Sequence, residues 1–372
     1  MMPESLKDAC RTVDVLVSDN AREWDSRAKI PKRILRDFCA HGLLCPQVPI
    51  SAGGRGLTSL LTGEFTAYVG SRCSSLRSVM TSHGMAAWTI QNFASRQQRD
   101  LYLAELTSGK LAAVGFSEPE AGSDLSAMTT SISRDGSMVV VNGHKAWVTA
   151  ADYADLIVIF GRLDDGAAAV VVPRSTAGVQ LERIADPLGC RAAGHANVYL
   201  DNVRLPIDNI LGCTAYSLSL MISAALTYGR ISVAWGCIGI LRCCLGEAAS
   251  HARARRQFGK PIGQHQLIKR HLAELYVLEQ SATRLCERAS QSWDTAAPDM
   301  AIMAVLAKHL SARNAVQGAA MAVQVLASAG AKNTDLVARA YRDSKLMEII
   351  EGTNEVCQLI LADHVMSARL WD

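Results

Sequence analysis

The chain has little net charge, and its cysteines follow no recognised spacing. Its 38 Lys and Arg residues nearly balance its 35 Asp and Glu residues, which leaves a formal net charge of +3. Charge therefore predicts no partnership with nucleic acid or a membrane surface. The 11 cysteines include no C-x-x-C pair, and no histidine lies near them at metal-ligand spacing. An odd number of cysteines without such spacing argues against structural zinc and a disulfide framework, and it favours buried reduced thiols in a cytoplasmic protein.

A secretory targeting signal and a dinucleotide-binding motif are also missing. Residues 1–8 lack the basic-then-apolar pattern of a secretory signal, which again favours the cytoplasm. No G-x-G-x-x-G follows a predicted strand, so a nicotinamide site of the Rossmann type is not indicated.

One stretch is apolar enough to be tested as a membrane span. Residues 209–229 and 231–241 carry no charge, but hydroxyl side chains interrupt the first run, and Arg230 and Arg242 bound the second. An arginine near the centre of a span would be costly. A helix buried on all sides inside a helical bundle is the better interpretation.

The order of predicted elements is helices, then a sheet, then helices again. Helical periodicity covers residues 1–115, including a small-residue helix over 74–93. Residues 116–212 contain short strand patterns, with Asn142-Gly143 predicted to form a hairpin turn between strands 138–141 and 144–149. Residues 213–372 return to long helical patterns. We expect an α+β fold with an N-terminal helical domain, a central antiparallel β-domain and a C-terminal helical bundle.

Glu351 occupies an unusual position between two predicted helices. Residues 349–355 read IIEGTNE, in which Gly352 suits a helix end and Thr353 or Asn354 suits the next N-cap. A carboxylate beside apolar neighbours is poorly solvated, which raises its proton affinity and suits a general base. The alternative at this point is an ordinary last-turn glutamate that faces solvent.

Three further segments could form a binding site. Residues 116–124 (FSEPEAGSD) form a small-residue turn whose backbone N–H groups and hydroxyls suit an electron-poor ring or a carrier chain. Residues 145–149 (KAWVT) place an aromatic side chain and a hydroxyl on one strand face. Residues 253–266 carry three arginines before a Phe-Gly break, which suits either a pyrophosphate clamp or a solvated helix end.

Together and in this order, these segments resemble the acyl-CoA dehydrogenase family. They are similar to its Thr/Ser-Glu-Pro-x-Ala-Gly-Ser-Asp flavin loop, its Asn-Gly-x-Lys-x-Trp-Ile-Thr strand segment, its Arg-x-x-Phe-Gly segment and its Glu-Gly-Thr catalytic turn. The resemblance spans nearly the whole chain. It implies that the C-terminal domain is a four-helix bundle and that FAD binds between the domains and at a subunit interface, hence a homodimer or homotetramer. The implied substrate is an acyl thioester of CoA or of a carrier protein. The residues specify no particular electron acceptor.

The resemblance assigns roles residue by residue. Glu351 matches the family's base, and Arg230 matches an arginine close to it that would hold the base ionised; because desolvation opposes this, the direction of the net pKa shift stays open. The implied cofactor-binding residues are Phe116, Ser117, Gly122, Ser123, Trp147, Thr149, Arg255, Phe258, Gln266, Gln324, Thr353 and Glu355. Of these, Arg255, Phe258, Gln266 and Gln324 would reach the FAD of a neighbouring subunit. The implied substrate contacts are Ser123, Gly352 and His195.

The sequence departs from the family pattern at several positions. Glu355 stands where glutamine is frequent, which puts a charge near the cofactor. Ala327 and Ser328 replace two glycines after Gln324, which puts the adenine contacts there in doubt. His195 stands where a small hydroxyl residue is usual, so it is either a polar substrate contact or a partly exposed loop histidine.

Finer features, such as residues 189–195 (GCRAAGH), resemble the acyl-carrier-protein dehydrogenases of polyketide extender-unit pathways. That resemblance implies oxidation of a carrier-bound three-carbon hydroxyacyl group to hydroxymalonyl-carrier protein. The alternatives are a short-chain acyl-CoA α,β-dehydrogenase and a non-catalytic flavin-binding protein.

Overall fold

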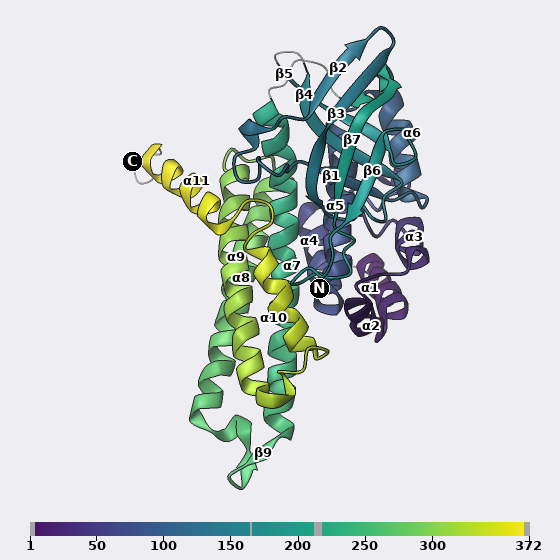
Figure 1. Ribbon diagram of the computed structural model, residues 1–372. Coiled ribbons are helices and arrows are strands. Elements are labelled where there is room, and N and C mark those ends of the chain that lie inside the picture. Colours follow the sequence, from purple (N-terminus) through teal and green to yellow (C-terminus); the bar gives the residue numbers. More distant parts are fainter. Residues whose placement is uncertain (1–3, 164–165, 212–217, 368–372) are drawn as a thin grey trace.

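The computed structural model describes residues 4–163, 166–211 and 218–367 (Figure 1). The predicted loop over Asp164 and Asp165 and the predicted boundary at 212/213 lie outside the described residues. The N-terminal part is helical, and its α-helices are α1 (Glu4–Val17), α2 (Asn20–Arg27), α3 (Lys32–Ala40), α4 (Ser59–Arg72), α5 (Ser74–Phe93) and α6 (Arg96–Thr107). The observed bounds of α5 coincide with the predicted small-residue helix.

The middle of the chain forms one sheet of eight strands. Its strands are β1 (Ala112–Gly115), β2 (Ser131–Asp135), β3 (Met138–Val148), β4 (Leu156–Leu163), β5 (Gly166–Pro173), β6 (Val179–Arg183), β7 (Ala196–Pro206) and β8 (Ile210–Leu211). They follow the order β6-β7-β3-β2-β4-β5-β8, and β1 pairs with β4. Most pairings are antiparallel, as predicted, but β1–β4 and β2–β4 are parallel.

The predicted hairpin turn at Asn142-Gly143 is wrong, because β3 runs through both residues. The register against β7 shifts between Val141 and Gly143, so the pair forms a bulge instead of a turn. A Cβ at Gly143 would lie 2.3 Å from the Thr130 hydroxyl oxygen, so close packing explains this glycine. The real turn follows Asp135, which pairs with Met138, and Gly136 supplies its positive φ of 61°.

The C-terminal part is a helical bundle with one projecting helix. Its helices are α7 (Leu218–Ala254), α8 (Gln266–Asp294), α9 (Met300–Leu326), α10 (Leu336–Met347) and α11 (Asn354–Ser367). A small hairpin of β9 (Arg256–Gln257) and β10 (Lys260–Pro261) joins α7 to α8 at the end of the bundle far from the sheet (Figure 1).

Helix α7 is the apolar stretch predicted to be buried. By length and composition alone it could cross a membrane, but 67% of its most apolar window is buried inside the protein. It packs against α4, α8 and α9, and Trp235 at its centre is fully buried. Its apolar character therefore serves the core of the bundle.

The described cysteines are all free thiols, and all but Cys243 are buried. Within residues 4–163, 166–211 and 218–367, no group of three or more His, Cys, Asp or Glu side chains could hold a metal ion.

Candidate active site

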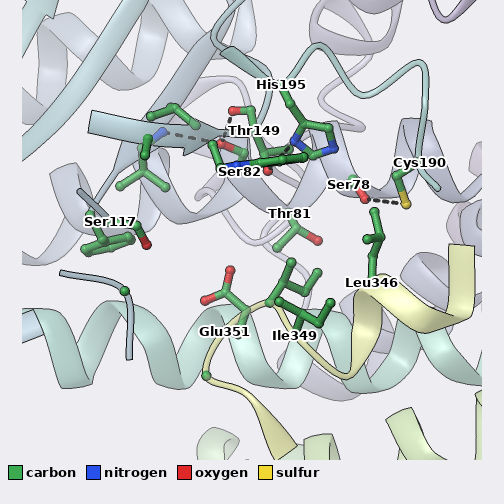
Figure 2. Close-up of a pocket in the computed structure, with 18 of the residues that line it drawn as sticks. Ser78, Thr81, Ser82, Ser117, Thr149, Cys190, His195, Leu346, Ile349 and Glu351 are labelled. Atoms are coloured by element: carbon green, nitrogen blue, oxygen red, sulfur yellow. Dashed lines mark hydrogen bonds between the residues drawn. The ribbon is translucent and has the colours of Figure 1, made fainter. Parts of the chain in front are cut away.

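A pocket of about 730 Å³ lies where α5, the sheet and the turn after α10 meet. Its walls come from the side chains of α5, the loop after β1, the end of β3 and the segment before β7. The turn that bears Glu351 lines a further side. Figure 2 shows the Glu351 carboxylate directed into this cavity, across from Thr149 and His195.

The turn after α10 holds Glu351 in a backbone conformation that few residues other than glycine adopt. Helix α10 ends at Met347, Glu351 has a φ of 57°, and Gly352 has a φ of 91°. The Thr353 hydroxyl accepts the Val356 N–H at 3.3 Å, so Thr353 is the N-cap of α11. Positive φ at a glutamate costs free energy that surrounding contacts must offset.

Two buried cations supply those contacts by binding backbone carbonyl oxygens. Arg230 Nε donates to the carbonyl of Glu351 at 3.1 Å. Lys308 Nζ donates to the carbonyls of Gly352 at 2.6 Å and Glu348 at 3.3 Å. The resemblance placed Arg230 close to Glu351, and in the fold its guanidinium reaches the backbone of that residue. Both cations thereby fix the direction of the turn.

The Glu351 carboxylate is desolvated and lacks a hydrogen-bond partner on one oxygen. Oε2 is buried and unpaired. A Cβ at Gly229 would lie 2.4 Å from Oε2, so the absence of a side chain on α7 makes room for the carboxylate. Burial raises the pKa of Glu351 to about 7, although Arg230, Lys308 and Arg77 each oppose the rise. The direction that the sequence left open is therefore upward, and a solvent-facing glutamate is excluded.

The loop after β1 is tied to β3 by a buried ion pair. Lys145 Nζ donates to Glu118 Oε1 at 2.7 Å and to the Phe116 carbonyl at 3.0 Å. The other contacts of the Glu118 carboxylate come from Thr129 and Thr130, through their N–H groups and hydroxyls. Burial alone would raise the pKa of Glu118, but these hydrogen bonds lower it to about 2. This pair fixes the loop that presents Ser117 to the pocket.

The end of β3 presents a broad aromatic surface and a hydroxyl. Trp147 is 54% exposed. Its backbone has a positive φ of 55°, which turns the strand where it meets the pocket. Thr149 Oγ1 and His195 Nδ1 lie 3.3 Å apart, and burial lowers the pKa of His195 to about 4, so this imidazole is neutral at pH 7. His195 is buried, with Nε2 unpartnered, so the partly exposed alternative is wrong.

The structure brings most of the predicted site residues into one pocket. Those that line it are Phe116, Ser117, Gly122, Ser123, Trp147, Thr149, His195, Glu351, Gly352 and Thr353. Phe116 also packs against Phe160, with ring centroids 4.5 Å apart. Arg230 lies behind the turn and binds its backbone.

The remaining predicted residues are not among those that line the pocket. Phe258 is 91% exposed at the tip of the β9–β10 hairpin, and Arg255 and Gln266 are exposed beside it. Gln324 is exposed near the C-terminal end of α9, and Glu355 is exposed in the first turn of α11. Within one subunit these side chains take no part in the pocket.

The sequence patterns did not predict a site role for several residues that shape the pocket. They are Arg77, Glu118, Lys145, Gly229 and Lys308. Glu118 and Lys145 stood inside recognised segments, so their motifs offered a signal. Arg77 and Lys308 lie within helical patterns, where a lone cation is usually solvated, and only the fold shows that both are buried.

A desolvated carboxylate at a pocket wall, an exposed indole and a polar turn suit an enzyme that removes a proton from a substrate held beside a flat cofactor. Comparison with known proteins agrees. The chain matches the family descriptions "Acyl-CoA dehydrogenase, N-terminal domain" over residues 4–110, "middle domain" over 113–203 and "C-terminal domain" over 219–366.

Similar proteins extend over almost the full chain. The human mitochondrial short-chain specific acyl-CoA dehydrogenase is 31% identical over 353 residues, which is 93% of this chain and 85% of that protein. The glutaryl-CoA dehydrogenase of Desulfococcus multivorans is 29% identical and covers 94% of this chain and 92% of its own. A solved structure titled "FkbI for Biosynthesis of Methoxymalonyl Extender Unit of Fk520 Polyketide Immunosuppresant" is 54% identical, with a TM-score of 0.93, and covers 96% of this chain and 99% of its own.

This chain belongs to the acyl-CoA dehydrogenase family. It is an oxidoreductase of acyl thioesters, in a family of flavin-dependent enzymes.

Proposed function

We propose that this chain is an FAD-dependent dehydrogenase that oxidises a carrier-protein-bound three-carbon hydroxyacyl group toward hydroxymalonyl-carrier protein. The observation that carries the catalytic part is the unpartnered Oε2 of Glu351, buried in the pocket on a carboxyl whose pKa burial raises to about 7. A carboxylate with this pKa takes up a proton near neutral pH most effectively.

The residues around the pocket fit a flavin ring. Trp147 offers an exposed indole face, and Ser117 and Thr149 offer hydroxyls around it. A Cβ at Gly122 would meet no heavy atom within 4 Å, so the loop leaves open space at that point. When bound, the flavin supplies the acceptor for a hydride. The chain's own task is to place the substrate, exclude water and receive the proton at Glu351.

Glu351 would act as the proton acceptor with either of two substrates, although the proton comes from a different atom in each. On a saturated acyl thioester it would take the proton from the carbon next to the thioester carbonyl while the β-hydrogen leaves as hydride. On a three-carbon hydroxyacyl group it would take the hydroxyl proton at C3 while a hydride leaves that carbon. The first C3 oxidation yields an aldehyde. Addition of water and a second oxidation would then yield the carboxylate, once an external electron acceptor has removed the first pair of electrons from the cofactor. The Glu351 backbone N–H would polarise the thioester oxygen.

The choice of a carrier-bound hydroxyacyl group rests on similarity. The structure that is 54% identical belongs, by its title, to methoxymalonyl extender-unit biosynthesis. A second candidate is a short-chain acyl-CoA α,β-dehydrogenase, which the 31% identity to the human short-chain enzyme favours.

We also propose that two subunits complete each FAD site, in a homodimer or a homotetramer. Arg255, Phe258 and Gln266 are exposed in and beside the β9–β10 hairpin, and Gln324 is exposed on α9. The hairpin lies at the end of the bundle far from the sheet (Figure 1). The guanidinium, ring and amide groups of these residues suit the pyrophosphate and adenosine of a neighbour's cofactor.

A cytoplasmic location remains a prediction.

Anaerobic stopped-flow measurement of flavin bleaching tests the proposed function. We expect bleaching on mixing with glyceryl-carrier protein and little with butyryl-CoA. Bleaching by butyryl-CoA alone would establish the second candidate. A protein that takes up no FAD would contradict both.

A further inference from the structure

Arg77 is a buried cation that faces the pocket and forms no ion pair among the described residues. Its charge reaches Glu351 and opposes the rise in the pKa of that carboxyl, but no hydrogen bond or ion pair joins the two side chains. It lies on α5, is 1% exposed and lines the cavity. Its NH1 donates to the Thr81 hydroxyl at 3.3 Å, and its NH2 contacts the sulfur of Met347 at 2.9 Å. Its Nε is buried and has no partner. A thioether is a weak acceptor, so most of the hydrogen-bonding capacity of this guanidinium is unused.

Other buried or half-buried cations of the chain either form ion pairs or bind backbone carbonyl oxygens. Lys145 pairs with Glu118, Arg342 with Asp25, and Arg242 with both Glu64 and Glu279. Arg230 and Lys308 hold backbone carbonyl oxygens of the Glu351 turn. None of the ion pairs formed within the described ranges of the chain includes Arg77. Because burying an unpaired charge is costly, an unpaired arginine at a pocket wall indicates a ligand that supplies the missing anion.

The surroundings of Arg77 keep the guanidinium in place. A Cβ at Gly236 of α7 would lie 2.7 Å from Arg77 Nε, and one at Gly70 of α4 would lie 3.6 Å from Arg77 Cγ. Gly236 therefore makes room for the arginine, whereas the contact at Gly70 is ordinary van der Waals packing. The side chain is fixed by packing before any ligand arrives, which lowers the entropy cost of binding.

Further polar groups stand near Arg77 in an otherwise largely apolar cavity. The hydroxyls of Thr81 and Ser232 lie 2.7 Å apart, and the Ser78 hydroxyl contacts the sulfur of Cys190 at 3.4 Å. His195 Nε2 is unpartnered, and Arg77 is close enough to help lower the pKa of His195, after burial. The hydroxyls already have protein partners, but a wholly hydrocarbon acyl chain would leave Arg77 Nε and His195 Nε2 unpaired.

We propose that Arg77 is the specificity residue that anchors oxygen atoms at the far end of the acyl group, and that it binds a terminal carboxylate most tightly. This inference rests on the proposed function and adds to it the residue that selects an oxygen-bearing three-carbon acyl group. The planar fork of a guanidinium matches a carboxylate at two points, whereas a hydroxyl offers one. A bound carboxylate would provide the partner for Nε and the charge that Arg77 lacks.

The test compares two acyl groups of the same shape. Malonyl- and isovaleryl-pantetheine share the thioester arm and differ in having a carboxylate or an isopropyl group at the end. Anaerobic isothermal titration calorimetry of the flavin-loaded protein measures their binding, and the flavin absorbance is followed in parallel to check that neither acyl group is oxidised. We expect the wild type to bind malonyl-pantetheine at least about 10-fold more tightly. The variant Arg77→Gln should lose about 10- to 100-fold in malonyl affinity and little in isovaleryl affinity, as expected for a charge-assisted hydrogen bond.

Two further variants separate charge recognition from folding. Arg77→Lys keeps the charge and should retain part of the preference for malonyl. Arg242→Gln removes an arginine that is ion-paired outside the pocket, and it should leave the ratio of the two affinities unchanged. Should Arg77→Gln fail to fold, the wild-type ratio decides: a wild type that binds isovaleryl-pantetheine as tightly as malonyl-pantetheine overturns the inference. So does an Arg77→Gln variant that keeps the malonyl preference.

The two proposals fail separately. Flavin bleaching by glyceryl-carrier protein with no preference for malonyl would leave the proposed function standing and remove the role of Arg77. A strong malonyl preference lost in Arg77→Gln, without bleaching by glyceryl-carrier protein, would do the reverse.

Discussion

Lys308 on α9 holds the turn that bears Glu351, because its ammonium donates to the Gly352 carbonyl at 2.6 Å. The next residue back, Glu351, has a positive φ and needs such support. A buried cation therefore does two things for Glu351. It fixes the backbone, and its charge opposes the rise of the Glu351 pKa.

Replacing Glu351 by glutamine tests the base. Glu351→Gln keeps the shape of the side chain, so we expect bound yellow flavin and a loss of at least about 10²-fold in turnover, the lower end for a positioned base. Rapid-mixing measurement of flavin reduction is the check. Unchanged reduction rates would rule out Glu351 as the proton acceptor.

The pH dependence of activity and stability follows from the same carboxyl. Since the proton acceptor must be ionised, flavin reduction should rise with pH, with a midpoint near the Glu351 pKa of about 7. The folded-state pKa is raised above 4.5, so the folded state holds the proton more tightly, and stability from this group is lost as pH rises from about 4.5 to 7. Above pH 7, Glu351→Gln should therefore be more stable than the wild type, by up to about 3 kcal/mol. Thermal melts at pH 5 and pH 8 measure this, and an equal effect at both would contradict it.

Gly229 leaves the space that the Glu351 carboxylate occupies. In Gly229→Ala the new methyl would lie 2.4 Å from Oε2 and displace the carboxylate, so we expect turnover to fall by more than about 10-fold with flavin retained. Gly246 lies on the same helix, and a Cβ there would meet nothing within 4 Å. Gly246→Ala is thus the matched control, with normal turnover and a gain in stability of up to about 1 kcal/mol. Equal kinetics for the two variants would show that the space at Gly229 is not needed.

Lys308→Met separates the positioning role of Lys308 from a purely structural one. The variant removes a donor to the Gly352 carbonyl and a positive charge near Glu351, so the midpoint of the pH–rate profile should move upward. Turnover at pH 7 should fall with it. A lower melting temperature with an unmoved pH midpoint would indicate that Lys308 only supports the fold.

The ion pair between Lys145 and Glu118 should govern flavin retention. Lys145→Met leaves the Glu118 carboxylate buried without its cation, which costs about 3–5 kcal/mol and loosens the loop that bears Ser117. We expect weaker FAD binding in a fluorescence titration. The double variant Lys145→Met/Glu118→Gln removes both charges and should recover part of the stability. A double variant no more stable than the single one would show that the pair is not coupled.

Local sequence patterns predicted much of the fold. The order of helices and strands, the bounds of α5 and the burial of α7 follow from periodicity and composition, which act over neighbouring residues. The Asn142-Gly143 prediction failed because a turn signal and a bulge share the same residues, and only contact with Thr130 and β7 selects the bulge.

The sequence by itself determined the segments of the site and, through the family resemblance, proposed Glu351 as the base, since motifs on single loops and strands carry that information. Only the tertiary structure decided the direction of the Glu351 pKa shift, the space at Gly229 and the unpaired state of Arg77. Each of these depends on desolvation and on contacts between helices far apart in the chain. Burial and charge pairing arise only when α5, α7, α9 and the turn after α10 pack around one pocket.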